Sequence, residues 1–321
     1  MAIELSNLTF TDQADIVPAS GVEEILNTGI ANTLAGNDII TGTGGTYSIY
    51  NSGTFNTADG NDVIIGVSNS QEGNLLYGYG IVNYGNGSTI NTGDGNDIII
   101  GIGHGPNDFS IDGILNQGGT INTGEGDDII IGTHTYSGIN NNADSTLDTG
   151  NGSDTITGIG DSFGIQNYFT FNTGDGNDKI TGTANLSGFG IVNVGTIDTG
   201  AGNDELTGTG SNGIYNDGII KTGNGKDSII ADGGFNGTGN VFLGNGQDYL
   251  KGFGSGNFNG GNGQDTLELT SGTYTVGILG TAVNFTNGST IMNTSEFEKL
   301  QAGNITYNFN SLTNGQTISV A

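Results

Sequence analysis

The sequence contains no cysteine and very little proline or basic residue: Cys 0, Pro 2 and Lys+Arg 5 in 321 residues. Without cysteine there are no disulfide bonds and no thiolate metal sites, so a metal ion would have to be bound mainly through oxygen. Gly 63 with so little proline is unlike collagen. The regular placement of Ile, Val and Phe argues against a disordered linker, so the chain has a core, although a thin one.

Basic residues are far too few to balance the acidic ones. Asp+Glu 33 against Lys+Arg 5 gives a formal net charge of -28. Such a chain repels phosphates and anionic lipid, which excludes nucleic acid and anionic membrane surfaces as partners. Self-repulsion of this size opposes compaction unless bound cations neutralise part of the charge.

Long apolar runs are also missing. The amino terminus, MAIELSNLTF, has no basic stretch followed by an apolar run. No segment approaches the ~18 apolar residues that a membrane span needs. We therefore expect neither membrane insertion nor a cleaved amino-terminal secretion signal.

What the sequence does contain is one repeated pattern, T-G-x-G-x-D-x-Φ-x-G, where Φ is apolar. Its ten copies are centred on Asp38, Asp62, Asp97, Asp128, Asp154, Asp178, Asp204, Asp227, Asp248 and Asp265. Each has glycine two residues before the aspartate and Ile or Leu two residues after it. The spacing varies between 17 and 35 residues, which fits a solenoid whose coils carry loops of different length on one edge.

Two further patterns accompany the aspartates. A second apolar position lies seven residues before each aspartate except Asp38. Together with the apolar residue two positions after the aspartate, it indicates two short facing strands per coil. A third motif, usually G-I-x-N, predicts a corner whose asparagines hydrogen-bond along the axis. Its asparagines are Asn32, Asn51, Asn83, Asn116, Asn141, Asn167, Asn193 and Asn216.

The patterns divide the chain into three parts. Residues 1–26 are expected to be an amino-terminal cap, residues 27–270 the repeat array, and residues 271–321 a β-rich carboxy-terminal cap. Within that cap, 273–292 reads as strands with a turn at Asn287-Gly288, 295–301 as a helical turn, and 305–320 as alternating strand.

The turns T-G-D-G-N-D at 92–97, T-G-E-G-D-D at 123–128 and G-G-N-G-Q-D at 260–265 resemble the nonapeptide of the RTX (repeats-in-toxin) hemolysin-type family. The resemblance covers about residues 33–270. It implies a right-handed parallel β-roll or β-solenoid, here of about ten coils, with Ca²⁺ between successive coils. The family usually carries two nonapeptides per coil, whereas this chain carries one, so we expect a single calcium ladder.

Elementary chemistry leads to the same cation. A glycine-rich turn directs several carbonyl oxygens into one concavity, and the aspartate adds a charged oxygen, which suits a hard cation with six to eight oxygen ligands. The ten repeat aspartates are therefore the expected metal ligands. The alternative is a series of Asx-turns without metal, but carboxylates stacked at about 4.8 Å strongly disfavour joint ionisation.

Catalytic signatures are missing. The sequence has only His104 and His134, and it has neither an H-E-x-x-H nor a G-x-S-x-G motif. We therefore expect no enzyme activity, no catalytic residues and no organic cofactor.

Two non-enzymatic classes remain. One is a calcium-dependent adhesin or glycan-binding module, soluble or surface-bound, for which Tyr47, Tyr77, Tyr79 and Tyr136 are candidate loop residues. An ice-binding roll is disfavoured, because no threonine occupies the third position of the turns. The other, which we favour, is a structural subunit of a surface layer, sheath, matrix or filament, able to associate head to tail through its strand edges. The RTX resemblance implies an extracellular or cell-surface location reached by type I secretion, with an uncleaved signal near residues 312–321.

Overall fold

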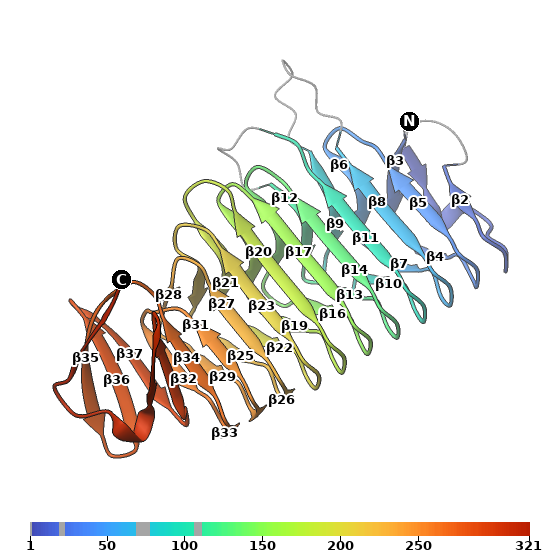
Figure 1. The fold of residues 1–321 in the computed structure, drawn as a ribbon. Coiled ribbons are helices and arrows are strands. Elements are labelled where there is room, and N and C mark those ends of the chain that lie inside the picture. Colours follow the sequence, from blue (N-terminus) through green and yellow to red (C-terminus); the bar gives the residue numbers. More distant parts are fainter. Residues whose placement is uncertain (1, 19–22, 69–77, 106–110) are drawn as a thin grey trace.

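The chain folds into a three-sided β-solenoid. The computed structural model describes residues 2–18, 23–68, 78–105 and 111–321 (Figure 1). Each coil passes through sheet A, then sheet C, then sheet B, and pairs in parallel with the coils before and after it. The predicted all-β parallel solenoid is confirmed. The prediction of two strands per coil was wrong, because the G-I-x-N motif forms a third strand rather than a corner.

The strands are grouped by sheet as follows. Sheet A contains β1 (Ala2–Glu4), β3 (Glu24–Asn27), β6 (Tyr47–Asn51), β9 (Tyr79–Tyr84), β12 (Asp112–Gln117), β15 (Ser137–Asn141), β18 (Phe163–Asn167), β21 (Phe189–Asn193), β24 (Ile214–Asn216) and β28 (Phe235–Asn236). Sheet C contains β4 (Ile30–Asn32), β7 (Thr54–Asn56), β10 (Thr89–Asn91), β13 (Thr120–Asn122), β16 (Thr146–Asp148), β19 (Thr170–Asn172), β22 (Thr196–Asp198), β25 (Ile219–Lys221), β29 (Asn240–Phe242), β32 (Gly256–Asn259), β37 (Thr290–Ser295), β36 (Ala282–Asn287), β35 (Gly272–Leu279) and β40 (Thr317–Val320). Sheet B contains β2 (Ile16–Val17), β5 (Ile39–Gly42), β8 (Val63–Val67), β11 (Ile98–Ile102), β14 (Ile129–Thr133), β17 (Thr155–Gly160), β20 (Lys179–Ala184), β23 (Glu205–Thr209), β27 (Ser228–Ala231), β31 (Tyr249–Lys251), β34 (Thr266–Leu269), β38 (Lys299–Ala302) and β39 (Ile305–Asn308). A small sheet pairs β26 (Asn224–Gly225), β30 (Asn245–Gly246) and β33 (Asn262–Gly263), and two short 3-10 turns are η1 (Leu5–Asn7) and η2 (Phe309–Ser311).

One apolar side chain from each sheet fills the interior of each coil. In one coil these are Ile81, Ile90 and Ile99, all fully buried. The parallel register places each beside its equivalent in the next coil, for example Ile99 beside Ile130. Burying one such side chain contributes about 1.5–3 kcal/mol, so the repetition builds the core. In the first coil, where the sequence pattern showed no apolar residue at the sheet C position, Ala31 is buried at that position.

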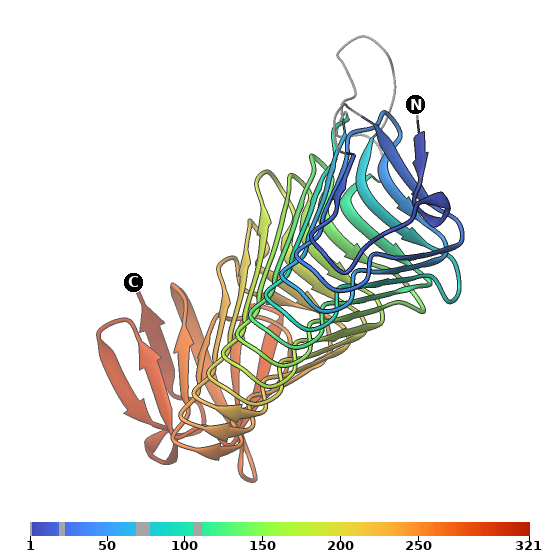
Figure 2. The same ribbon diagram turned by 90° about the vertical axis from the view of Figure 1, so that its right-hand side faces the viewer.

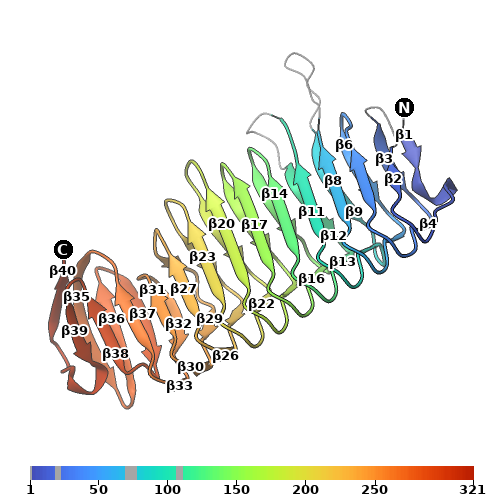
Figure 3. The same ribbon diagram turned by 45° about the vertical axis from the view of Figure 1, so that its right-hand side comes forward.

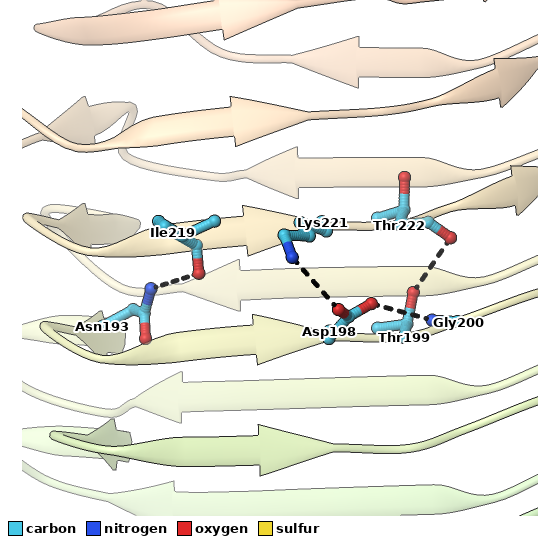
Figure 4. A network of polar contacts seen from close by, with 7 residues as sticks. All are labelled: Asn193, Asp198, Thr199, Gly200, Ile219, Lys221 and Thr222. Atoms are coloured by element: carbon cyan, nitrogen blue, oxygen red, sulfur yellow. Dashed lines mark hydrogen bonds and ion pairs between the residues drawn. The ribbon is translucent and has the colours of Figure 1, made fainter.

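Buried asparagines link the coils along sheet A, as expected. The side-chain amide of each donates to the side-chain oxygen of the next at 2.7–2.9 Å. The same amide also donates to a backbone carbonyl in sheet C of the next coil, as Asn193 does to Ile219 at 3.0 Å (Figure 4). The first member was wrongly predicted: Asn27 begins this ladder, whereas Asn32 is exposed and lies in sheet C.

Glycine sets the distance between coils at the turns that join sheets C and B. These turns lie along the lower edge of the solenoid in Figure 1, and the longer connections lie along its upper edge. A Cβ built on Gly126 would lie 1.9 Å from the carbonyl oxygen of Gly95 in the preceding coil. The φ of Gly126 is also positive, at 136°. Only glycine satisfies both conditions, which explains why every copy has it there.

Both ends of the solenoid continue the coil. Parallel pairing begins with β1 against β3 and β2 against β5, so the residues before 27 already contribute strands to sheets A and B. Leu5 in η1 is fully buried and covers the core at that end. The two termini lie at opposite ends of the molecule (Figure 2). No helix among the described residues is long and apolar enough to cross a membrane.

At the carboxy end, sheet C turns antiparallel through β37, β36, β35 and β40 (Figure 3). The expected turn at Asn287-Gly288 is confirmed, with Gly288 at φ 60°. The expected helical turn at 295–301 was wrong. There β37 ends at Ser295 and β38 begins at Lys299, joined by a tight turn with Glu296 at φ 57°.

The glycine contact gives a direct test of the stacking distance. Gly126→Ala should lower the free energy of unfolding by at least about 3 kcal/mol, because the methyl group collides with backbone and the φ is strained. Gly45→Ala is the control, since a Cβ there meets nothing within 4 Å, and it should change stability by less than about 0.5 kcal/mol. Urea unfolding followed by circular dichroism measures both. Equal effects would contradict this account.

Candidate metal centre

The ten repeat aspartates occupy one position in the fold, at the end of the turn between sheets C and B. Each directly precedes a strand of sheet B, as Asp97 precedes β11. The structure therefore brings all ten into one line along the lower edge in Figure 1. Their side chains are buried, with exposed fractions of 0–2 %. They point into the turn rather than into solvent.

One oxygen of each carboxylate has a structural partner. The Oδ1 of each aspartate accepts a hydrogen bond from the backbone N–H of the aspartate one coil earlier, at 2.7–2.9 Å. These bonds satisfy an amide at the start of each sheet B strand that has no backbone partner there. This part of the arrangement corresponds to turn closure, which needs no metal.

At each end of this chain of bonds lies a further carboxylate group that was not predicted from the sequence. Asp15 donates its backbone N–H to Oδ1 of Asp38 at 2.7 Å, and Asp265 donates to Oε2 of Glu298 at 2.7 Å. Both were detectable, because Asp15 and Glu298 each lie two residues before a buried apolar side chain, Val17 and Leu300. The glycine-rich turn that defined the motif is absent from both.

A second series of hydrogen bonds runs in the opposite direction on the outside of the same turns. In seven of the ten copies, the residue before the aspartate accepts, through its side chain, the backbone N–H of its equivalent in the next coil. Asn61 accepts from Asn96 at 2.8 Å, and Asn96 accepts from Asp127 at 2.9 Å. Both amides preceding the sheet B strand are therefore bonded to side chains.

The second oxygen of each carboxylate, Oδ2, is where the site is incomplete. In eight of the ten it is buried and has no hydrogen-bond partner; these are Asp38, Asp62, Asp97, Asp128, Asp154, Asp227, Asp248 and Asp265. In the other two, Asp178 and Asp204, it accepts from a threonine hydroxyl at 2.7 Å. An unpaired buried carboxylate oxygen is costly, so something must compensate for it.

The threonine at the start of the turn cannot compensate in full. The hydroxyl of Thr199 lies 2.7 Å from Oδ2 of Asp204. It also lies 3.4 Å from the carbonyl oxygen of Thr222 in the next coil (Figure 4). It carries one proton, so it can donate well to only one of them. Lys221, near this edge, is paired outside the turn with Asp198 at 3.5 Å.

Burial raises the pKa of these aspartates, because the charged form is removed from water. The pKa rises to about 7 for Asp128, Asp178 and Asp227. It rises to about 6 for Asp62 and Asp154. The threonine hydroxyl of the same turn and the neighbouring backbone N–H lower the pKa, but they do not cancel the effect of desolvation. Near neutral pH the turns must therefore either take up protons or bind a cation.

The available donors fit a hard cation only if the backbone contributes. No group of three or more His, Asp or Glu side chains among the described residues could hold a metal ion. Six of the ten turns instead offer an unpaired Oδ2, a threonine oxygen and glycine carbonyls together. The carbonyl oxygen of Gly95 is directed at the next coil, as its closeness to the Cβ position of Gly126 indicates. Oxygen donors of this mixed kind suit Ca²⁺.

The histidines do not extend this site. His134 is 4 % exposed, and its Nδ1 accepts the backbone N–H of Tyr136 at 2.8 Å. Burial lowers the pKa of His134 to about 4, so it stays neutral at physiological pH. His104 lies at the opposite edge of the coil from the aspartates, in the connection after β11.

The tyrosines proposed as glycan contacts are mostly packed on one another. Tyr47 and Tyr79 begin strands β6 and β9, and their rings stack with centroids 5.6 Å apart. Tyr136 packs edge-on against Phe163 at 5.5 Å. All three are only partly exposed. Tyr77 lies outside the described residues.

Comparison with protein-family models, with curated proteins and with solved structures finds no match to this chain.

The raised pKa values predict an unusual pH dependence in the absence of divalent cations. A carboxyl group whose pKa rises from 3.8 to 6 or 7 on folding stabilises the fold when protonated. That stabilisation is complete below pH about 4 and is lost as the pH rises through 6 to 7. In chelator, the melting temperature should therefore be at least about 5 °C higher at pH 5 than at pH 8. A melting temperature that increases with pH would rule out this reasoning.

Proposed function

We propose that the protein is a secreted, calcium-binding structural protein whose turns bind Ca²⁺ between successive coils. One observation carries the proposal: eight stacked, buried carboxylates each have an oxygen without a hydrogen-bond partner. A divalent cation would neutralise two neighbouring carboxylates at once, which removes both the desolvation cost and the repulsion along the stack.

Calcium suits these turns better than other common cations. The described turns present carboxylate, hydroxyl and carbonyl oxygens, and the chain has no cysteine. Zinc and copper favour nitrogen and sulfur ligands. Magnesium demands near-ideal octahedral geometry and gives up its water reluctantly, whereas calcium accepts irregular shells of six to eight oxygens. Asp38 to Asp265 would be its ligands, one from each turn.

Binding of this kind would couple folding to location. An ion that binds the stacked turns but not the unfolded chain adds its binding free energy to folding. The chain would then remain loosely folded where calcium is scarce and fold where calcium is millimolar, outside the cell. Such coupling agrees with export by type I secretion, which the RTX resemblance implies.

The shape of the fold supports the proposed structural role. The solenoid is a rod of stacked coils, and its described residues offer no cluster of catalytic side chains beyond the turn carboxylates. We therefore propose a subunit of a surface layer, sheath, matrix or filament rather than an enzyme. Exposed edge residues such as Ile16 and Ile30, at 58 % and 74 % exposed, lie at the amino-terminal end, where another subunit could pair with the sheets.

Calcium and acid should be interchangeable stabilisers of the fold. At pH 8, millimolar Ca²⁺ should raise the melting temperature by at least about 10 °C over chelator, because many sites contribute. At pH 5 the increase should be much smaller, because the carboxylates are already protonated. Circular dichroism during thermal unfolding measures both, with Mg²⁺ at equal concentration as control. No gain at pH 8 would refute the proposed site.

A single substitution separates metal binding from turn closure. Asp128→Asn keeps the oxygen that accepts the N–H of Asp97 but loses the charge. In chelator at pH 8 the variant should be at least as stable as the wild type, because a buried charge is gone. In calcium it should bind at least one ion fewer by equilibrium dialysis and lose part of the calcium-induced stabilisation.

The matched control is Asp127→Asn. Asp127 is exposed in the same turn, and its Oδ1 accepts the backbone N–H of Ser153. This variant should keep the full number of bound ions. If Asp128→Asn also kept that number, the aspartates would serve only to close the turns.

A further inference from the structure

The outer face of sheet B differs from the rest of this acidic protein. The strands β5, β8, β11, β14, β17, β20 and β23 lie side by side and in register there (Figure 3). Inward-facing residues alternate with outward-facing ones along each strand, so every second residue faces outward. We call the outward residues of these seven strands the sheet B face.

Half of the sheet B face is aliphatic. The central row consists of Ile65, Ile100 and Ile131, paired across β8, β11 and β14. Val63, Ile98 and Ile129 form the row beside it, and all of these side chains are partly exposed. Single exposed apolar residues are common, but a contiguous group on a flat sheet usually marks a contact surface.

The remainder of the sheet B face is neutral and rich in threonine. In β17, β20 and β23 the central row continues as Thr157, Thr181 and Thr207. Its only charged residues are Lys179 and Glu205, which form an ion pair at 2.7 Å. A protein with a formal net charge of -28 thus keeps unpaired charge off this surface. Two copies could approach each other here with little repulsion.

The dimensions of the sheet B face decide what can cover it. The three aliphatic strands β8, β11 and β14 span about 14 by 16 Å, or ~230 Å², too small for a stable interface alone. All seven strands span about 34 by 16 Å, so two such faces would bury about 1,100 Å² in total. This exceeds the roughly 1,000 Å² that a specific interface requires. The covering surface must therefore be as flat and as long as this face.

We propose that the sheet B face binds the same face of a second copy of this chain, forming a two-fold symmetric dimer of parallel rods. A two-fold axis that is parallel to the solenoid and passes over the central row places that row opposite its own copy, and it places each flanking row opposite the row on the other side of the centre. The isoleucine rows then interdigitate between two sheets about 10 Å apart, as in packed sheets and steric zippers. This contact closes at two copies and does not require calcium ligands.

Sedimentation equilibrium in millimolar calcium at neutral pH tests the proposal. The wild type should be a dimer at high micromolar concentration and dissociate on dilution, as expected for an interface of this size. The double variant Ile100→Lys, Ile131→Lys should weaken dimerisation at least ~100-fold, because four unpaired charges, two from each copy, would be buried at the centre. The single variant Ile100→Thr places in this row the residue that β17, β20 and β23 carry there, and it should weaken the dimer less.

The matched control carries the same charges in the same coils on another face. Thr89→Lys with Thr120→Lys places both lysines on the outer surface of sheet C, in β10 and β13, and should leave the dimer unchanged. Circular dichroism of every variant reports calcium-dependent folding separately, so loss of the dimer and loss of the proposed metal sites are distinguishable. A wild type that stays monomeric at every concentration would overturn the proposal, even if it adhered to an alkyl-coated or polysaccharide surface. So would equal weakening by the sheet C control.

Discussion

The whole structure depends on keeping successive coils one strand spacing apart at the turns between sheets C and B. The glycine carbonyls there are directed at the glycines of the next coil and leave no room for a side chain. That spacing puts each aspartate within 2.7–2.9 Å of the N–H in the coil before it. It also crowds ten carboxylates into one line. The close spacing that allows the coils to stack thus also brings the buried carboxylates together, and a cation or protons must relieve their repulsion.

The two stacks of buried polar side chains, asparagines in sheet A and aspartates at the turns, differ in how their hydrogen bonds are satisfied. The asparagines of sheet A are neutral, and each both donates and accepts, so a buried stack of them is self-sufficient except at its first member, Asn27, whose side-chain oxygen has no partner. The aspartates can only accept when ionised, so their stack leaves an oxygen over in most coils. Asparagine has a side-chain amide where aspartate has a carboxylate. This difference distinguishes the asparagine ladder, which is structural, from the line of aspartates, which is a candidate metal site.

Much of this was predictable from the sequence, because repetition makes the role of each position visible. The aspartate line, the aliphatic core and most of the asparagine ladder follow from residues such as Asp97, Ile99 and Asn116 recurring in step. The third strand was missed, since a buried asparagine two residues after an isoleucine is as consistent with a corner as with a strand. The ends were misread where the motif fades, at Asn27, Asp15 and Glu298. The sheet B face was not foreseen, because which of the alternating residues faces outward becomes clear only once the core side is known.

The uneven spacing of the aspartates has a consequence for how such a chain can change. From sheet C through the turn into sheet B the coils keep step residue by residue. The variation between 17 and 35 residues falls almost entirely in the connection from sheet B back to sheet A. Insertions at that edge disturb neither the turns nor the core. Coils can therefore be added, removed or given longer loops one at a time, while the stack of sheets stays continuous.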